Sequence, residues 1–364
     1  MPPGTFFSNI KANRDRSMLR REAVKILIAG WAAGALRKEK RSSSGRAGEA
    51  AAPKGIASNA RSDNQSSVLI KVLGTAQDGG IPQIGCRCRN CERARRNPSQ
   101  ARLIASLGLA DLEERKLFLI DASPDIRAQV DRALGIFPPP APALMDVLAG
   151  VLLTHAHIGH YTGLMFFGYE SLDARHLPVH CSPRMAEFLA ANGPWNQLIR
   201  LENISLEVFK PGEKIRLTAS LAAIPVPVPH RNEYTDTFGF EIVGPTRSLL
   251  YIPDIQSWET WERSLDEALR ATDVALLDGT FFGPDDLPGR DINEIGHPQV
   301  LDTIRRMKSV PAADCATVLF THLNHTHPAL DPAGRARREI EESGARLAED
   351  GEVIDLSGPA PPRL

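Results

Sequence analysis

The sequence predicts one large domain of the mixed α/β (α+β) class, spanning residues 68–364. Short apolar runs typical of buried strands alternate with helical stretches along this region, as in chains that pack helices against sheets. Residue types that bind metals follow the ends of several of these runs, where loops gather and sites are built. No solenoid-type repeat is visible.

The predicted strands are short apolar runs that end at polar or turn-forming residues. In chain order they are Val68–Leu73, Leu117–Asp121, Val147–Leu153, Leu177–Cys181, Ile224–Val228, Phe238–Ile242, Ser248–Ile252, Val274–Leu277 and Thr317–Phe320. Helices are predicted between them at Arg184–Asn192, Trp258–Arg270 and Pro298–Met307. This order gives the class but does not by itself name a fold.

Residues 1–67 are predicted to be an export signal and a disordered linker. The pair Arg20-Arg21 precedes the apolar block Ile26–Leu36, about half the length of a membrane span. This order is typical of a cleaved signal of the twin-arginine type, although an ordinary amphipathic helix or a misassigned start would look similar. Residues 37–67 lack the apolar periodicity of a folded segment. A working signal would make the protein periplasmic; otherwise we expect it in the cytoplasm.

The charges are nearly balanced, with 43 Lys and Arg against 44 Asp and Glu and a net charge of −1. No basic stripe with interleaved aromatic residues is present, so the composition argues against a nucleic-acid partner. The expected partner is a small-molecule substrate, and no membrane span is expected in the mature protein.

Three histidines lie in the segment THAHIGH, residues 154–160, directly after a predicted strand. His155, His157 and His160 can converge only if the chain turns sharply there, and Gly159 tolerates the backbone angles of such a turn. Neutral imidazole is the commonest zinc ligand and also suits iron. The cluster favours a metal centre over three surface histidines.

Further donors follow other predicted strands. His230, Asp254 and His322 each come just after an apolar run. Singly, each has an ordinary explanation as a turn or cap residue. Together with the histidine cluster they supply enough ligands for two metal ions.

A second group of possible ligands is Cys86, Cys88 and Cys91, in a Cys-x-Cys-x-x-Cys pattern. Three thiolates this close suit a structural zinc ion, which requires a fourth ligand. Disulfides are the alternative, because export would permit them, but three cysteines are an odd number. Cys181 and Cys315 are predicted to be buried thiols.

These motifs, in this order, resemble the metallo-β-lactamase superfamily and, within it, the coenzyme PQQ biosynthesis protein B family. The segments that carry the resemblance are Val72–Gly80, Gly80–Gln83, Asp121–Arg127, His155–His160, Asp278–Phe281, Gly289–Asp291 and His322–Asn324. The resemblance implies an αββα sandwich, with two sheets, helices outside and metal ions at one edge.

The resemblance also implies the ligand sets. The first metal position would use His155, His157 and His230. The second would use His160, His322 and Asp254, with Asp254 bridging. The centre would hold Zn²⁺ or Fe²⁺, as one or two ions.

One residue departs from the superfamily pattern, because Gly159 stands where an aspartate usually precedes the last histidine. The PQQ family tends to keep that aspartate and to lose the first two histidines, whereas this chain does the reverse. The loss of a carboxylate makes double occupancy questionable. Gly159→Asp is expected to raise metal stoichiometry, and Asp278 is the candidate for a replacement ligand.

Similarity to phosphodiesterases of the superfamily implies two more roles. His325, three residues after His322, would be the fourth ligand of the cysteine zinc site. His297 would be a proton donor, although it could equally cap the helix that starts at Pro298.

Three functions are compatible with these features. The first is a metal-dependent hydrolase in which Asp254 orients a metal-activated water and His297 protonates the leaving group. The second is an iron-dependent oxygenase of PQQ biosynthesis, supported by the two-histidine, one-carboxylate set of His160, His322 and Asp254. The third is a non-enzymatic carrier. PQQ assembly is expected in the cytoplasm, so an active export signal would weigh against the second function.

Overall fold

The structure, a computed structural model, describes residues 68–287, 289 and 295–359, which belong to one compact unit, Asp63–Leu364. The predicted export signal and linker lie outside the described residues, as do Arg290 and Asp291 of one motif. In the part that is described, no helix is both long enough and apolar enough to cross a membrane.

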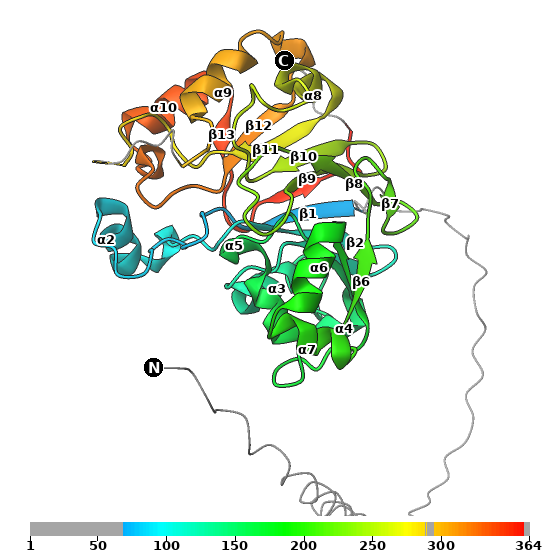
Figure 1. Cartoon of the computed structure of the whole chain (residues 1–364). Helices are drawn as coiled ribbons and strands as arrows, with labels where there is room; N and C mark the ends of the chain where they lie inside the picture. Colours follow the sequence, from blue (N-terminus) through cyan, green and yellow to red (C-terminus); the bar gives the residue numbers. More distant parts are fainter. Residues whose placement is uncertain (1–67, 288, 290–294, 360–364) are drawn as a thin grey trace, which may run out of the picture. The chain divides into compact units, whose positions relative to one another are not determined.

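Two seven-stranded sheets form the centre of the fold (Figure 1). The first has the order β14-β1-β2-β3-β4-β5-β6. Its strands are β1 Val68–Gly74, β2 Ser106–Asp111, β3 Lys116–Ile120, β4 Leu148–Leu152, β5 Leu177–Cys181, β6 Ile204–Val208 and β14 Val353–Asp355. The second has the order β13-β12-β11-β10-β9-β8-β7. Its strands are β7 Ile215–Arg216, β8 Ala222–Pro227, β9 Phe238–Val243, β10 Ser248–Ile252, β11 Val274–Asp278, β12 Thr317–Thr321 and β13 Arg346–Leu347.

Helices cover the outer face of each sheet (Figure 1). On the first sheet these are α3 Ile126–Leu134, α4 Leu144–Val147, α6 Pro183–Ala191 and α7 Trp195–Arg200, and on the second α8 Leu265–Ala271, α9 Val300–Met307 and α10 Arg335–Glu342. A third core, which includes Ile70, Phe240 and Tyr251, fills the space between the sheets. The architecture is therefore the αββα sandwich that the resemblance implied.

Strand direction brings the functional loops to one edge. Strands β10, β11 and β12 are parallel to one another, as are β3, β4 and β5. Strand β1 runs parallel to β3, because β2 lies between them and is antiparallel to both. Strand β8 runs parallel to β10 for the same reason, with β9 between them. The loops that follow β1, β4, β8, β10 and β12 thus leave from carboxyl ends, the usual place for ligand sites in such sheets.

All nine predicted strands are confirmed, and each predicted boundary lies within two residues of the observed one. Strand β2 was not predicted: its sequence, SLGLAD, has no β-branched residue, and its pairing with β1 and β3 forms it. The helix predicted at Trp258–Arg270 begins only at Leu265. Before that point Trp258 is buried in a bend, where its indole donates to Thr303.

Candidate metal centre

The predicted histidines converge because the chain leaves β4 and enters the short helix α5, Ile158–Tyr161. The ring centroid of His155 lies 4.5 Å from that of His157 and 4.3 Å from that of His160. Gly159 lies inside α5 and is not among the glycines with positive φ. The predicted turn exists, but an unusual φ at Gly159 does not produce it.

Asp254, in the loop after β10, lies at the middle of the cluster. Its Oδ2 is 3.0 Å from Nε2 of His160 and 3.2 Å from Nε2 of His322. The same oxygen is 3.9 Å from Nε2 of His155, and Oδ1 is 3.6 Å from Nε2 of His230. One carboxylate therefore faces histidines of both predicted metal positions, as a bridging ligand must.

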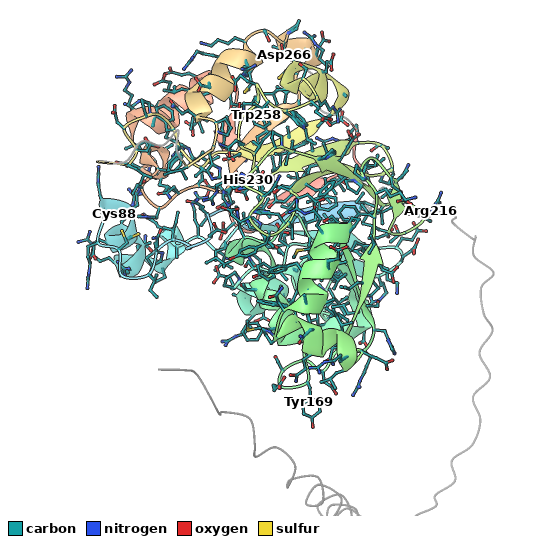
Figure 2. The ribbon with its side chains drawn as sticks, in the orientation of Figure 1. Cys88, Tyr169, Arg216, His230, Trp258 and Asp266 are labelled. Carbon is teal, nitrogen blue, oxygen red and sulfur yellow. The ribbon has the colours of Figure 1, made fainter. Side chains whose placement is uncertain are left out.

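The first position is completed by a contact between two loops. Nε2 of His230 lies 3.3 Å from Nδ1 of His157. His155, His157 and His230 each offer a ligand atom, and these atoms lie within 4.8 Å of one another. Figure 2 labels His230, which lies where the two halves of the sandwich meet.

Several polar atoms in this cluster are buried without a hydrogen-bond partner among the described residues. They are Nε2 of His155, His160 and His322 and Oδ2 of Asp254. Burying unpaired polar atoms costs free energy, and four such atoms converging on one point is unusual for native proteins. Imidazole nitrogen and carboxylate oxygen are ligand types of Zn²⁺ and Fe²⁺, so the residues present fit a metal centre.

The Nδ1 atoms of His155, His160 and His322 are held by polar side chains. Nδ1 of His160 donates to Oδ2 of Asp121 at 2.7 Å, and both side chains are fully buried. Oγ1 of Thr154 lies 2.9 Å from Nδ1 of His155, and Oγ1 of Thr280 lies 3.0 Å from Nδ1 of His322. Such partners fix the ring orientation of metal-ligating histidines.

Sequence reasoning assigned no role to these supporting residues. Asp121 follows β3 as Asp254 follows β10, and this shared position was the available signal. Thr154 and Thr280 carry no such signal, because threonine after a strand is common.

Burial and charge keep most of the imidazoles neutral, the form that binds metal. Burial lowers the pKa of His155 well below its usual value and that of His230 to about 4. Burial would raise the pKa of Asp254, but the imidazoles of His322 and His160 outweigh it and hold that pKa well below normal. For His160, burial is outweighed by the carboxylates of Asp121 and Asp254, which raise its pKa well above normal.

His297 and Asp278 form a separate pair at the edge of the centre. Nδ1 of His297 donates to Oδ2 of Asp278 at 2.7 Å and lies 3.9 Å from Oδ1 of Asp254. Burial lowers the pKa of His297, but Asp278 outweighs that effect, so the pKa is raised overall. Asp278 also accepts from Thr280 and from the backbone N–H of Ile255. Its contacts support His297, so the suggestion that Asp278 replaces the missing carboxylate is not supported.

A different carboxylate lies beside Gly159. Oδ1 of Asp78, in the loop after β1, accepts the backbone N–H of Gly159 at 3.0 Å and lies 3.7 Å from Nε2 of His160. A Cβ at position 159 would lie 2.2 Å from that oxygen. The expectation that Gly159→Asp simply adds a ligand is therefore wrong, because its side chain would collide with Asp78.

The cysteine group lies apart from this centre, at the end of the molecule labelled by Cys88 in Figure 2. Nδ1 of His325 is 3.4 Å from Sγ of Cys86, 3.4 Å from Sγ of Cys88 and 3.7 Å from Sγ of Cys91. These three cysteines are thiols, not disulfides. The predicted ligands are brought together at spacings that suit one tetrahedral zinc ion, whose bonds are about 2.0–2.3 Å long.

Backbone groups and neighbours support this cysteine group. The N–H of Gln83 donates to Sγ of Cys91 at 3.3 Å, and the N–H of Cys88 donates to Sγ of Cys86 at 3.4 Å. Burial lowers the pKa of His325, which keeps its imidazole neutral. Away from this group, Cys181 is buried as predicted, whereas Cys315 is only half-buried, against the core between the second sheet and its helices.

The fold and the sequence together define the class of protein. The family model described as β-lactamase superfamily domain matches residues 116–334. The chain belongs to this superfamily. Among its relatives, coenzyme PQQ synthesis protein B of Nitrosococcus oceani is 30% identical over 318 residues, covering 79% of this chain and 100% of that protein.

Solved structures agree on the fold. Zinc-bound PqqB from Methylobacterium extorquens matches with a TM-score of 0.67 and 22% identity, covering 79% of this chain and 100% of that one. A diphosphatase of the PhnP family matches with a TM-score of 0.54 and 22% identity, covering 79% and 96%. At these identities the likeness concerns the fold alone.

Proposed function

We propose that this protein is a metal-dependent hydrolase acting on a small-molecule substrate. The observation that carries the proposal is Asp254, whose carboxylate faces the histidines of both predicted metal positions. His155 and His157 also support the proposal, because with His230 they form a three-histidine set of the kind that catalytic zinc uses.

Each residue of the centre has a separate role in this proposal. His155, His157 and His230 would hold one ion, and His160 and His322 would hold a second, with Asp254 between them. A bound metal supplies a hydroxide nucleophile at neutral pH by lowering the pKa of its water to about 7. Asp254 would accept a hydrogen bond from such a water and so orient it.

His297 would carry the proton for the leaving group. Its Nδ1 is fixed by Asp278, which orients the ring and favours the protonated form. A cavity of about 230 Å³ opens beside His297, lined also by Gln256, Gly296 and Gln299. A substrate group in this cavity would lie next to the imidazole, as general acid catalysis requires.

The test begins with the metal content of the full-length protein by elemental analysis. Zinc-loaded protein is then assayed with a chromogenic phosphodiester, ester and β-lactam. Metal-dependent hydrolysis that Asp254→Asn and His155→Ala both abolish supports the proposal. His176→Ala is the matched control, because His176 is an exposed histidine that pairs with Glu202 and not with a residue of the centre.

A second candidate is an iron-dependent oxygenase in PQQ biosynthesis. Its support is the 30% identity to coenzyme PQQ synthesis protein B over 318 residues, covering 79% of this chain. His160, His322 and Asp254 also form the two-histidine, one-carboxylate set of non-haem iron oxygenases. Oxygen consumption by iron-loaded protein, without hydrolysis by zinc-loaded protein, would favour this candidate. Absence of both activities in loaded protein would favour a carrier.

We further propose that the twin-arginine segment exports the protein to the periplasm. The support is the order of Arg20-Arg21 and the apolar block Ile26–Leu36. Fractionation of cells that express the wild type and a variant with both arginines changed to lysine tests this. Equal amounts of both proteins in the cytoplasm would contradict export.

A further inference from the structure

The carboxyl group of Asp78 occupies the space that a side chain at position 159 would need. A Cβ on Gly159 would lie 2.2 Å from Oδ1 of Asp78 and 2.9 Å from its Cα. Real Cβ atoms essentially never approach other atoms so closely, so the two positions cannot both carry side chains without a shift. Asp78 can occupy this space only because residue 159 is a glycine.

The same carboxylate faces the second metal position. Oδ1 of Asp78 is 3.7 Å from Nε2 of His160, and the ligand atoms of Asp78, His160 and His322 lie within 4.8 Å of one another. Two ligands on one zinc ion, with bonds of about 2.1 Å, lie roughly 3.4 Å apart in a tetrahedral arrangement. Asp78 is therefore at ligand distance from a metal held by these histidines.

The loop that carries Asp78 is joined to the segment that carries His322. Ala76 forms a β-bridge with Leu323, and the N–H of Gln77 donates to the carbonyl of Leu323 at 2.9 Å. The side chain of Gln77 accepts from the amide of Asn324 at 2.6 Å. Asp78 thus enters the centre from a backbone that is fixed relative to His322, as a preorganised ligand requires.

We propose that Asp78 is the carboxylate ligand of the second metal position, delivered from the loop after β1 in place of an aspartate at position 159. The inference rests on the proposed metal centre. The second ion would then have His160, His322, Asp78 and the shared Asp254. This set of two imidazoles and two carboxylates restores the charge that Gly159 removes from the motif and suits a second divalent ion.

A purely structural role for Asp78 is the alternative, because its Oδ1 also accepts the N–H of Gly159. Asp78→Asn separates the two roles: an amide oxygen can still accept that hydrogen bond but lacks the negative charge. We expect Asp78→Asn to bind the second metal ion at least about tenfold more weakly than the wild type, since even outer-shell substitutions cost roughly 10–100-fold in metal affinity. Elemental analysis after dialysis against graded zinc buffers measures this, together with the absorption spectrum of cobalt-substituted protein.

The matched control is Asp125→Asn, because Asp125 accepts the N–H of Ile104 beside the same loop at 2.9 Å. It should keep wild-type stoichiometry and the wild-type cobalt spectrum. Asp78→Ala removes the carboxylate altogether and should lose the second ion. Gly159→Asp alone should not raise stoichiometry.

Equal second-position affinity in the wild type and Asp78→Asn would overturn the assignment of Asp78 while leaving the two-metal centre intact. Equal second-position affinity in the wild type and Asp78→Ala would also contradict it. A wild type that takes up metal only at the cysteine group would overturn the proposed function and this inference together. The two failures are therefore distinguishable.

Discussion

Sγ of Cys88 lies 3.4 Å from Nδ1 of His325, although 237 residues separate them in the sequence. Cys88 precedes α2, Arg89–Arg96, and His325 follows β12. Asn90 strengthens the contact, since its side-chain amide donates to the carbonyl of His325 at 3.0 Å and to that of His327 at 3.1 Å. A zinc ion here would tie the segment after the first strand to the segment after β12.

Cys88→Ala and His325→Ala are expected to destabilise the protein to a similar extent, by a few kcal/mol, because each removes one zinc ligand and structural zinc contributes folding free energy. Thermal and urea unfolding of the metal-replete protein, with zinc content by elemental analysis, measure the effect.

Cys181→Ala is the control, because Cys181 is buried away from this group. It should cost only about 1 kcal/mol, the scale of a small deletion in the core. If His325→Ala kept its zinc and its stability while Cys88→Ala lost both, the four-ligand assignment would be wrong.

His155→Ala and His157→Ala are each expected to lower the metal content of the centre by one ion while the far-ultraviolet circular dichroism spectrum is retained. Both residues lie in the loop after β4, so the strand and its packing remain. Zinc at the cysteine group should be unaffected and serves as an internal standard. Full metal content and activity in both variants would refute the first metal position.

Asp121→Asn is expected to weaken metal binding at the second position by roughly 10–100-fold, because a neutral amide replaces the carboxylate that orients His160. Competition with a chromogenic zinc chelator measures the affinity. Asp111→Asn is the matched control, since Asp111 is also fully buried and accepts from Thr218 and Ser220. It should cost stability without changing metal affinity; equal affinities in both variants would contradict the role of Asp121.

Cys181 is expected to resist alkylation in the native protein. Burial, with the charges of Asp236 and Glu207, raises its pKa to about 12, so at pH 8 only about one thiol in ten thousand is ionised. Cys86, whose pKa is lowered by hydrogen bonds from Cys88 despite burial, should react once a chelator has removed zinc. Peptide mass spectrometry after iodoacetamide treatment, with and without chelator or urea, tests the difference. Native alkylation of Cys181 at the rate of Cys86 would contradict it.

The sequence by itself determined the fold class, most strands and the histidines of the centre. These depend on local patterns: an apolar run predicts a buried strand, and a donor just after it lies at a sheet edge whatever the strand order. The three cysteines were equally visible because they are close in sequence. The pairing of the cysteines with His325 required the resemblance, since no local pattern joins segments 234–239 residues apart.

The resemblance implied Asp254 as a ligand, but only the tertiary structure decided which other carboxylates reach the histidines. Asp254, Asp121 and Asp78 follow strands and Asp278 ends one, but strand order and pairing place them differently. Asp278 contacts His297, Asp121 contacts Nδ1 of His160, and Asp78 reaches the Nε2 side through a loop fixed to the segment after β12. Gly159 was read as a missing ligand because the atom that fills its space comes from a residue 81 positions earlier in the chain.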